Sequence, residues 1–299
     1  MNMKRLHLEH PEDTILTGDL SVLDAFLAPN DYSVKIDGSP AIVWGTNPEN
    51  GKFFVGTKSV FNKKTPKINY TEEDICRNHP QFELQSILIR CLHCLPRTAA
   101  VPFQVFQGDF IGYGGYRDYK PNVISYTFDR VMNKGIVVAP HTYYTGNTLK
   151  DMKANALTFV LLGGDAADFI QPDAWISQYG ATMDIKMMVG FAKQMATLVD
   201  FATEKEAKQL KIDLNAYVRD GDEVVAEEFA NYQLVRLWCL VENIKTEYMK
   251  LMRDNFKVDC FLGNEYVDGE GYVMTGEHGT YKLVNRWVFS HYNFNVSRS

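Results

Sequence analysis

The chain lacks any apolar run long enough to cross a membrane. The strongest candidate, ALTFVLLGG at residues 156–164, is far shorter than the roughly 18 residues that a membrane-spanning helix needs. The first residues, MNMKRLHLEHPEDTIL, also lack the apolar core of a signal peptide. We therefore expect a soluble, cytoplasmic protein with no membrane partner.

Cysteine is also scarce. The 299 residues contain five cysteines, an odd number that does not suggest a disulfide framework. Four possible zinc ligands nevertheless lie close together, in Cys76-x-x-His79 and Cys91-x-x-Cys94. Alternatively, residues 82–95 form an amphipathic helix whose cysteines fill the core. Helix packing explains the cysteines without a metal, and the sequence leaves zinc open as the second interpretation.

A positive net charge is missing as well. The formal charge of −6 argues against a non-specific nucleic-acid coat protein. Residues 151–270 carry 21 acidic and 12 basic residues, so the acidic excess is local. In contrast, residues 51–67 contain five lysines and no acid. This run is either a solvated strand and loop or an edge that faces phosphate. Its lysines are Lys52, Lys58, Lys63, Lys64 and Lys67.

The pattern of residue types predicts an α+β fold. Stretches rich in β-branched and aromatic residues, separated by glycine and Asn-Pro turns, predict strands at 32–61, 101–115, 122–131 and 135–146. Helical spacing dominates from about 147 to 256, and strand character then returns. We therefore expect one domain built from residues 1–146 and 257–299, with residues 147–256 as a helical subdomain or insertion.

The turn KIDG at residues 35–38 contains a lysine that could be a nucleophile. The simpler interpretation is a charged hairpin, because Asp-Gly is a common turn. A nucleophilic lysine must lose its proton near neutral pH, and a neighbouring cation or desolvation can achieve this. A site for a nucleotide substrate would also require carboxylates that bind Mg²⁺ and cations that neutralise the charge developing on the phosphate.

Residues of the required types occur on the expected strands. Asp109 lies in VFQGDFIGYG, Glu270 in GEGYVM, and Lys282 in TYKLVNR. Phe128 and Tyr126 lie in SYTFD and could stack on a base. Taken singly, each residue has a structural interpretation as a turn former, an exposed charge or a core aromatic.

Taken in order, these short motifs resemble the covalent nucleotidyltransferases. KIDG (35–38), GDF (108–110), SYTFD (125–129), EGYV (270–273) and YKLVN (281–285) are similar to the motifs of ATP-dependent DNA ligases, RNA ligases and mRNA capping enzymes. The RNA ligase 2-like group is the most similar. The resemblance implies an adenylation domain of two antiparallel β layers with flanking helices. It also implies that ATP and Mg²⁺ bind between the layers.

The resemblance also implies a role for each matching residue. Lys35 would take AMP in a phosphoramidate bond, and Lys282 would contact the α-phosphate and lower the pKa of Lys35. Glu270 would support the Mg²⁺ ion. The nucleotide would be held by Asp37 and Gly38 of the lysine motif, Lys58 at ribose or phosphate, Asp109 at the ribose hydroxyls, and Phe128 at adenine, with Tyr126 as the second choice.

Several positions depart from the family pattern. Asp109 replaces the usual Glu, and Lys58 replaces a residue that is commonly Arg. Val284 stands where the last motif has a second lysine, and Arg286 could substitute if the strand continues with its period of two. The 17 residues after Lys282 also leave no room for the C-terminal domain of DNA ligases.

We therefore expect an ATP-dependent ligase that joins nucleic-acid ends, with RNA preferred over DNA. One alternative is a related protein that binds nucleotide or nucleic acid without sealing. Another is an enzyme that transfers the nucleotide to a different acceptor, with residues 147–256 contacting a protein partner.

Overall fold

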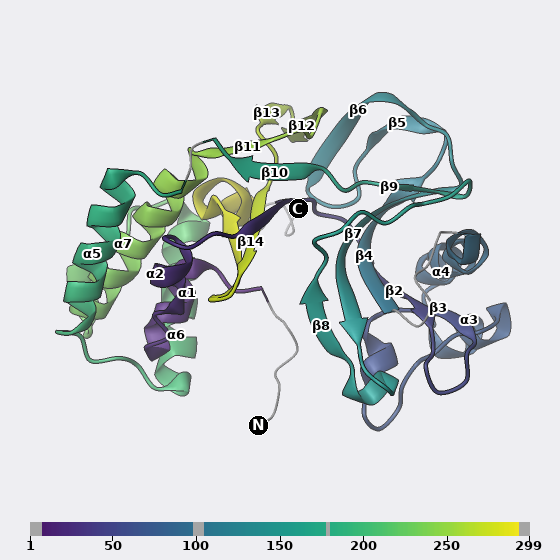
Figure 1. Cartoon of the computed structure of the whole chain (residues 1–299), viewed down its shortest axis with the longest axis horizontal. Helices are drawn as coiled ribbons and strands as arrows, with labels where there is room; N and C mark the ends of the chain where they lie inside the picture. The colour runs from purple at the N-terminus through teal and green to yellow at the C-terminus, as the bar shows by residue number, and fades with distance from the viewer. Residues whose placement is uncertain (1–7, 98–104, 178–179, 293–299) are drawn as a thin grey trace. The chain divides into compact units, whose positions relative to one another are not determined.

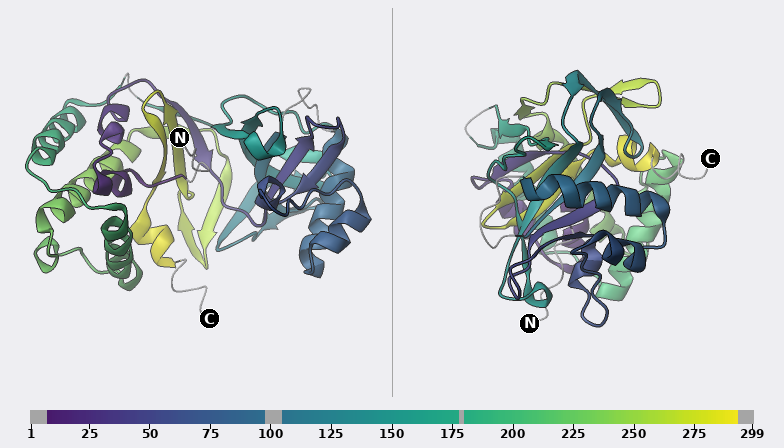
Figure 2. Two further views of the ribbon diagram at one scale, coloured as in Figure 1. Left: turned by 90° about the horizontal axis from the view of Figure 1, so that it is seen from below. Right: turned by 90° about the vertical axis from the view of Figure 1, so that its right-hand side faces the viewer.

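A computed structural model describes residues 8–97, 105–177 and 180–292 (Figures 1 and 2). The chain forms two compact units, each assembled from separate segments. In the described part, unit 1 comprises residues 36–171 and 257–269, and unit 2 comprises 8–35, 172–256 and the residues from 270 onward. Each unit contains helices and antiparallel sheet, so the predicted α+β class is confirmed.

Unit 1 contains two sheets. The larger has the strand order β3-β2-β4-β7-β8 and is antiparallel, with β9 added parallel to β7. Its strands are β2 (Ala41–Thr46), β3 (Phe53–Gly56), β4 (Val105–Tyr113), β7 (Ile136–Thr145), β8 (Lys153–Ala156) and β9 (Ala167–Phe169). The smaller sheet is antiparallel and comprises β13 (Glu265–Val267), β12 (Val258–Leu262), β6 (Ile124–Met132) and β5 (Tyr116–Tyr119).

Two helices cover one face of the larger sheet in unit 1, α3 (Glu72–Asn78) and α4 (Phe82–Cys94) (Figure 1). Thr71 and Asp74 form a capping box that fixes the start of α3, as the sequence Thr-x-x-Asp favours. The opposite face carries a second apolar cluster beneath two 3₁₀ turns, η2 (Lys58–Phe61) and η4 (Leu149–Asp151). The predicted strands around the KIDG turn are confirmed, although β3 ends before η2 instead of continuing to Phe61.

Unit 2 consists of one sheet with a helical layer on one face. The sheet has the order β11-β10-β1-β14-β15. Its strands are β1 (Asp31–Lys35), β10 (Asp173–Ile176), β11 (Met252–Asp254), β14 (Gly271–Gly276) and β15 (Gly279–Val284). The helices are α1 (Pro11–Thr14), α2 (Ser21–Ala25), α5 (Met183–Ala196), α6 (Glu204–Asp220) and α7 (Tyr232–Met249), followed by a π-helical turn, η6 (Arg286–Ser290).

Alternation along the strands decides which face of this sheet meets the helices. Met274, Tyr281 and Leu283 belong to the helical core cluster, together with Trp238 and Tyr248 of α7. Because successive side chains in a strand point to opposite faces, the residues between them face away from the helices. One face of the unit 2 sheet is thus apolar and covered by helices, and the other carries the polar residues described below.

The structure corrects the predicted extent of the helical segment. Residues 147–176 contain the strands β8, β9 and β10, and the first long helix begins at Met183. The division of the chain also differs from the predicted one, because unit 2 joins the helices to residues 8–35 and to the C-terminal strands. The physical reason is that β10 and β11 pair into the same sheet as β1, and the helices pack on that sheet. Among the described helices, none is both long enough and apolar enough to cross a membrane.

Candidate functional site

Lys35 ends β1 in unit 2 and points its amine at a carboxylate. Its Nζ atom lies 2.5 Å from Oε2 of Glu270, the residue immediately before β14. The two side chains are only 21% and 12% exposed. A charge-assisted contact of this kind, largely withdrawn from water, fixes the position of the lysine more firmly than a surface ion pair does. The amine of Lys35 is therefore fixed by an ion pair and is not an exposed surface charge.

Strand register brings Lys282 to the same face of the sheet as Lys35. Lys35 pairs with Gly271 on β14, and Gly271 pairs with Val284 on β15. Lys282 lies two residues before Val284 and so shares its face. Gly271 has φ +139°, and a Cβ there would lie 2.1 Å from the carbonyl oxygen of Leu283. Strand β14, which lies between the strands of the two lysines, therefore has no side chain at position 271.

The two lysines also interact electrostatically. Burial, followed by the positive charge of Lys35, lowers the pKa of Lys282, against opposing effects of Asp13 and Glu9. The backbone N–H of Lys282 donates to the carbonyl oxygen of Glu9, 3.1 Å away. Unit 2 thus concentrates two amines and one carboxylate on the polar face of a single sheet, an arrangement able to bind an anionic phosphate group.

In unit 1 the Asp37–Gly38 turn contacts two of the other motifs. The N–H of Asp37 donates to the hydroxyl of Tyr126, 2.8 Å away. The amide of Asn122 donates to the Asp37 carboxylate at 2.6 Å. A Cβ on Gly38 would lie 2.8 Å from the carbonyl oxygen of Phe110 and 2.9 Å from Cβ of Asp109. The turn therefore needs glycine, and it lies directly against the GDF motif.

The other four sequence motifs divide between the two units, and the KIDG turn itself is split between Lys35 of unit 2 and Ile36 of unit 1. GDF and SYTFD contact its second half within unit 1. EGYV and YKLVN accompany Lys35 within unit 2.

Asp109 has a neighbour that the sequence did not single out. Oδ1 of Asp109 lies 3.7 Å from Nε2 of His141 on β7. The register of β4 and β7 shifts between Gln107 and Gly108, and His141 is left without a paired residue on β4. A bulge of this kind turns a side chain toward a position that regular pairing would not reach.

Lys58 is exposed at the first position of η2.

The aromatic candidates are buried. Phe128 is 6% exposed and packs edge-to-face on Tyr119, with ring centroids 5.7 Å apart. Tyr126 is also buried, and its hydroxyl receives the N–H of Asp37. The structure therefore favours the core interpretation of Phe128 over adenine stacking, and it gives Tyr126 a role in holding the KIDG turn.

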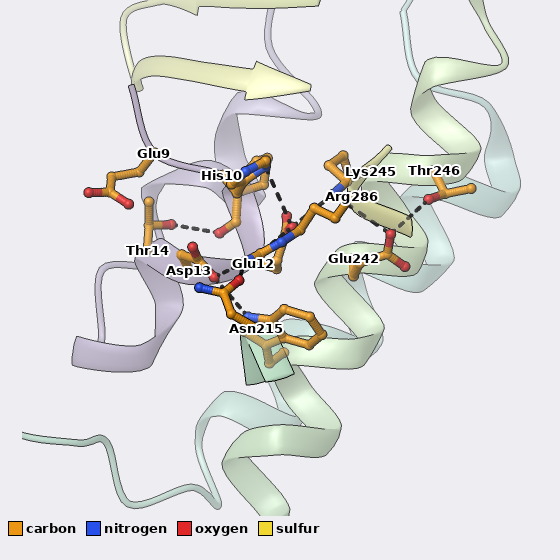
Figure 3. A network of polar contacts seen from close by, with 12 residues as sticks. Glu9, His10, Glu12, Asp13, Thr14, Asn215, Glu242, Lys245, Thr246 and Arg286 are labelled. Atoms are coloured by element: carbon orange, nitrogen blue, oxygen red, sulfur yellow. Dashed lines mark hydrogen bonds and ion pairs between the residues drawn. The ribbon is translucent and has the colours of Figure 1, made fainter. Parts of the chain in front are cut away.

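Arg286 does not continue β15, so the prediction that it replaces the missing lysine is wrong. The strand ends at Val284, and Arg286 begins η6, where the Asn285 side chain caps the turn. Its guanidinium is buried and donates to Asp13 at 2.8 Å and to Glu12 at 3.3 Å (Figure 3). Arg286 is thereby committed to a buried ionic network in unit 2.

The rest of this network lies beneath the helices of unit 2. Lys245 of α7 is 0% exposed and donates to Glu12 at 2.8 Å. The indole N–H of Trp238 donates to Asp13 at 3.0 Å. Attraction to Lys245 and Arg286 outweighs burial and lowers the pKa of Glu12, so its carboxylate is ionised. The network ties α1 to α7 and η6.

His10 adds a pH-dependent element beside this network. Nδ1 of His10 lies 3.8 Å from Glu12, yet burial, and then the positive charges of Lys282 and Arg286, lower the pKa of His10.

This lowered pKa of His10 makes the stability depend on pH. Below the ordinary histidine pKa of about 6.5, His10 takes up a proton in the unfolded chain but not in the folded protein. We expect the free energy of unfolding to fall by about 1–2 kcal/mol from pH 6.5 to 5, measured by urea denaturation. His10→Gln should flatten that slope, and an unchanged slope in the variant would contradict this origin.

The possible zinc ligands do not form a metal site. Cys91 and Cys94 are buried in α4 against the sheet of unit 1, whereas Cys76 is exposed. His79 is buried, and its Nε2 lies 3.3 Å from the amide nitrogen of Asn69. Within residues 8–97, 105–177 and 180–292, no three His, Cys, Asp or Glu side chains are grouped to hold a metal ion. The core-filling interpretation of the cysteines in α4 is confirmed.

A protein-family model described as "Family of unknown function (DUF6267)" matches the chain over residues 4–229 and 222–298. No curated protein and no solved structure matches the chain significantly.

Proposed function

The chain belongs to this family of unknown function, and we propose from its own residues that it is an ATP-dependent polynucleotide ligase acting through a covalent lysyl-AMP. The observation that carries the proposal is the pairing of Lys35 with Glu270 beside Lys282 on one sheet face. This is the arrangement that the resemblance to covalent nucleotidyltransferases, and to RNA ligase 2-like enzymes among them, leads one to expect.

In the proposed reaction, the deprotonated amine of Lys35 attacks the α-phosphorus of ATP. A nitrogen–phosphorus bond forms, the bond from the α-phosphorus to the pyrophosphate oxygen breaks, and the attacking nitrogen releases one proton to water. Glu270 holds the Lys35 amine in place before the attack. Lys282 supplies positive charge for the phosphate oxygens as charge develops on them. In the family's usual sequence, AMP then passes to a 5′-phosphate end, and a 3′-hydroxyl seals the junction with release of AMP.

The resemblance assigns contacts with the nucleoside and its phosphates to residues that lie in unit 1. Asp109, paired with His141, offers a carboxylate to the ribose hydroxyls. Lys58 offers an exposed ammonium group to ribose or phosphate, and the Asp37–Gly38 turn supplies backbone close to Asp109. The buried Phe128 does not offer an open ring face to adenine.

Magnesium fits this site through one carboxylate. Mg²⁺ in phosphoryl-transfer enzymes is commonly held by one or two carboxylates together with substrate phosphates. Glu270, whose Oε2 lies 2.5 Å from the amine of Lys35, would be that carboxylate. When bound, the ion would neutralise charge on the phosphates. We place the activity in the cytoplasm, where ATP is present.

A labelling experiment tests the proposal. Protein incubated with Mg²⁺ and ATP labelled at the α-phosphate should retain label after denaturation, whereas ATP labelled at the γ-phosphate should leave none. The bond should be labile to acid and stable to hydroxylamine, as expected of a phosphoramidate. Absence of label from α-labelled ATP, or label from γ-labelled ATP, would contradict the proposal.

The second candidate is a relative that forms lysyl-AMP or binds nucleotide without sealing ends. It is favoured by the contacts of Arg286, whose guanidinium binds Glu12 and Asp13. Among the described residues, Arg286 therefore does not replace the second lysine that the family motif has at the position of Val284. A nick-sealing assay on RNA and DNA duplexes separates the two. Covalent labelling without sealing of either duplex would support the second candidate.

A further inference from the structure

Six lysines gather at one end of unit 1, on the 3₁₀ turns η2 and η4 and the segments that follow them. We call this the basic surface. It comprises Lys58, Lys63, Lys64, Lys67, Lys150 and Lys153. All except Lys67, which is partly buried, are exposed. Residues 51–67 supply most of it, and β8 with η4 supplies the rest.

Apolar packing holds the two parts of this surface together. Val60 of η2 and Leu149 of η4 belong to the same buried cluster. The ring of Phe61 lies 4.5 Å from that of Tyr144, centroid to centroid. The N–H of Leu149 donates to the carboxylate of Glu49 at 3.4 Å. Lysines that lie about ninety residues apart in the sequence are therefore presented by one rigid support.

The lysines of this surface outnumber the acidic residues of the segments that carry them. None of the six lysines forms an ion pair with any residue in the described ranges, in contrast to Lys193 and Lys211 of unit 2, which pair with Asp24 and Glu9. The segments that carry the six lysines, residues 58–67 and 149–153, contain a single acidic residue, Asp151. Its carboxylate accepts the hydroxyl of Thr148. A cluster of lysines without ion-pair partners raises the local positive potential, and this potential attracts an anionic partner.

The chemistry of the surface favours an extended polyanion. Lysine ammonium groups contact phosphates as compact point charges and lack the planar fork with which arginine binds bidentately. The rest of the chain is strongly acidic, since the whole carries −6 while residues 51–67 alone carry +5. A polyanion is therefore attracted to the basic surface and repelled by the acidic segment at residues 151–270.

We propose that the basic surface binds the phosphodiester backbone of the nucleic acid whose ends the protein joins, without reading its sequence. This inference rests on the proposed ligase function, because it names where that substrate lies on unit 1. Each lysine that neutralises a duplex phosphate releases a counterion, and this makes the affinity depend on salt.

Salt dependence of binding provides the test. The probes are a nicked RNA duplex and a nicked DNA duplex of the same sequence, and the variant is Lys63→Gln/Lys64→Gln/Lys150→Gln. Lys58 is left intact because it belongs to the proposed nucleotide site. The slope of the logarithm of the association constant against log salt is negative, and we expect its magnitude to decrease by about 0.9 for each lost contact. Binding at about 0.1 M salt should weaken at least tenfold.

A matched variant makes the same charge change on unit 2. Lys186, Lys205 and Lys208 are exposed on α5 and α6 and form no ion pair with a described residue. Lys186→Gln/Lys205→Gln/Lys208→Gln should keep the slope and affinity of the unsubstituted protein. Equal loss in the two triple variants, no binding of either duplex, or equally strong competition by polyglutamate would overturn the proposal.

The same variants separate this inference from the proposed function. If α-labelled ATP still labels the basic-surface variant while duplex binding is unaffected, the inference fails and the ligase chemistry stands. If the unsubstituted protein takes no label but binds duplex with a slope that the variant loses, the proposed function fails and the surface stands.

Discussion

Lys35→Arg is expected to abolish covalent labelling by α-labelled ATP. Arginine keeps a positive charge that can pair with Glu270, so the partly buried carboxylate is not left alone. The guanidinium stays protonated at any pH at which the protein is folded, because its pKa exceeds about 12, and it cannot attack phosphorus. We expect label to fall below detection, a loss of at least about a thousandfold, in an assay that resolves the denatured protein by electrophoresis.

Lys193→Arg is the matched control for that experiment. Lys193 pairs with Asp24 at 2.5 Å, the same separation as between Lys35 and Glu270, but both side chains of this pair are nearly half exposed. Labelling of this variant should equal that of the unsubstituted protein. If Lys35→Arg retained label, another residue would be the nucleophile. If both variants lost label, the effect would be one of folding and not of chemistry.

The strands near the KIDG turn could be predicted because their residues obey local rules. YSVKID and SPAIVWG are rich in β-branched and aromatic residues, and they correspond to β1 and β2. The strands β8, β9 and β10 could not be predicted, since each has only three or four residues. Alternation has no room to appear over so short a length, and pairing with distant strands decides the structure.

The candidate site was partly predictable for a similar reason. Lys35, Glu270 and Lys282 lie on regular strands, where the period of two carries a side chain to a known face. Arg286 follows the point at which the strand gives way to a π-helical turn, so the same rule fails there. His141 was missed because only a bulge in the β4–β7 register places it near Asp109.

The buried ionic network shows a further limit of sequence reasoning. The segment LEHPEDTIL contains three acidic residues, yet Glu12 is fully buried and Asp13 nearly so. Their partners Lys245 and Arg286 are more than 200 residues away in the chain. No local pattern encodes a pairing of that kind, because each charge is acceptable inside the protein only when the complete set is present.

Lys245→Met is therefore expected to destabilise unit 2 strongly. Methionine fills a similar volume in α7 but leaves Glu12 paired with Arg286 alone, and Oε2 of Glu12 already has no hydrogen-bond partner. Removing one partner of a buried pair costs about 3–5 kcal/mol, which should appear as a lower urea midpoint. Lys250→Met is the control at the end of the same helix. Lys250 pairs with Glu247 but is well exposed, so its loss should cost less than about 1 kcal/mol.

A double variant shows whether the penalty comes from the uncompensated charge. Glu12→Gln combined with Lys245→Met removes both members of the pair and leaves Arg286 with Asp13 and Asn215. The double variant should be more stable than the sum of the two single changes predicts, by about 1–3 kcal/mol. Strict additivity would mean that the cost of Lys245→Met comes from lost packing and not from a buried carboxylate left without its cation. The coupling should be larger than for any exposed pair, because water screens an exposed charge but does not reach Glu12.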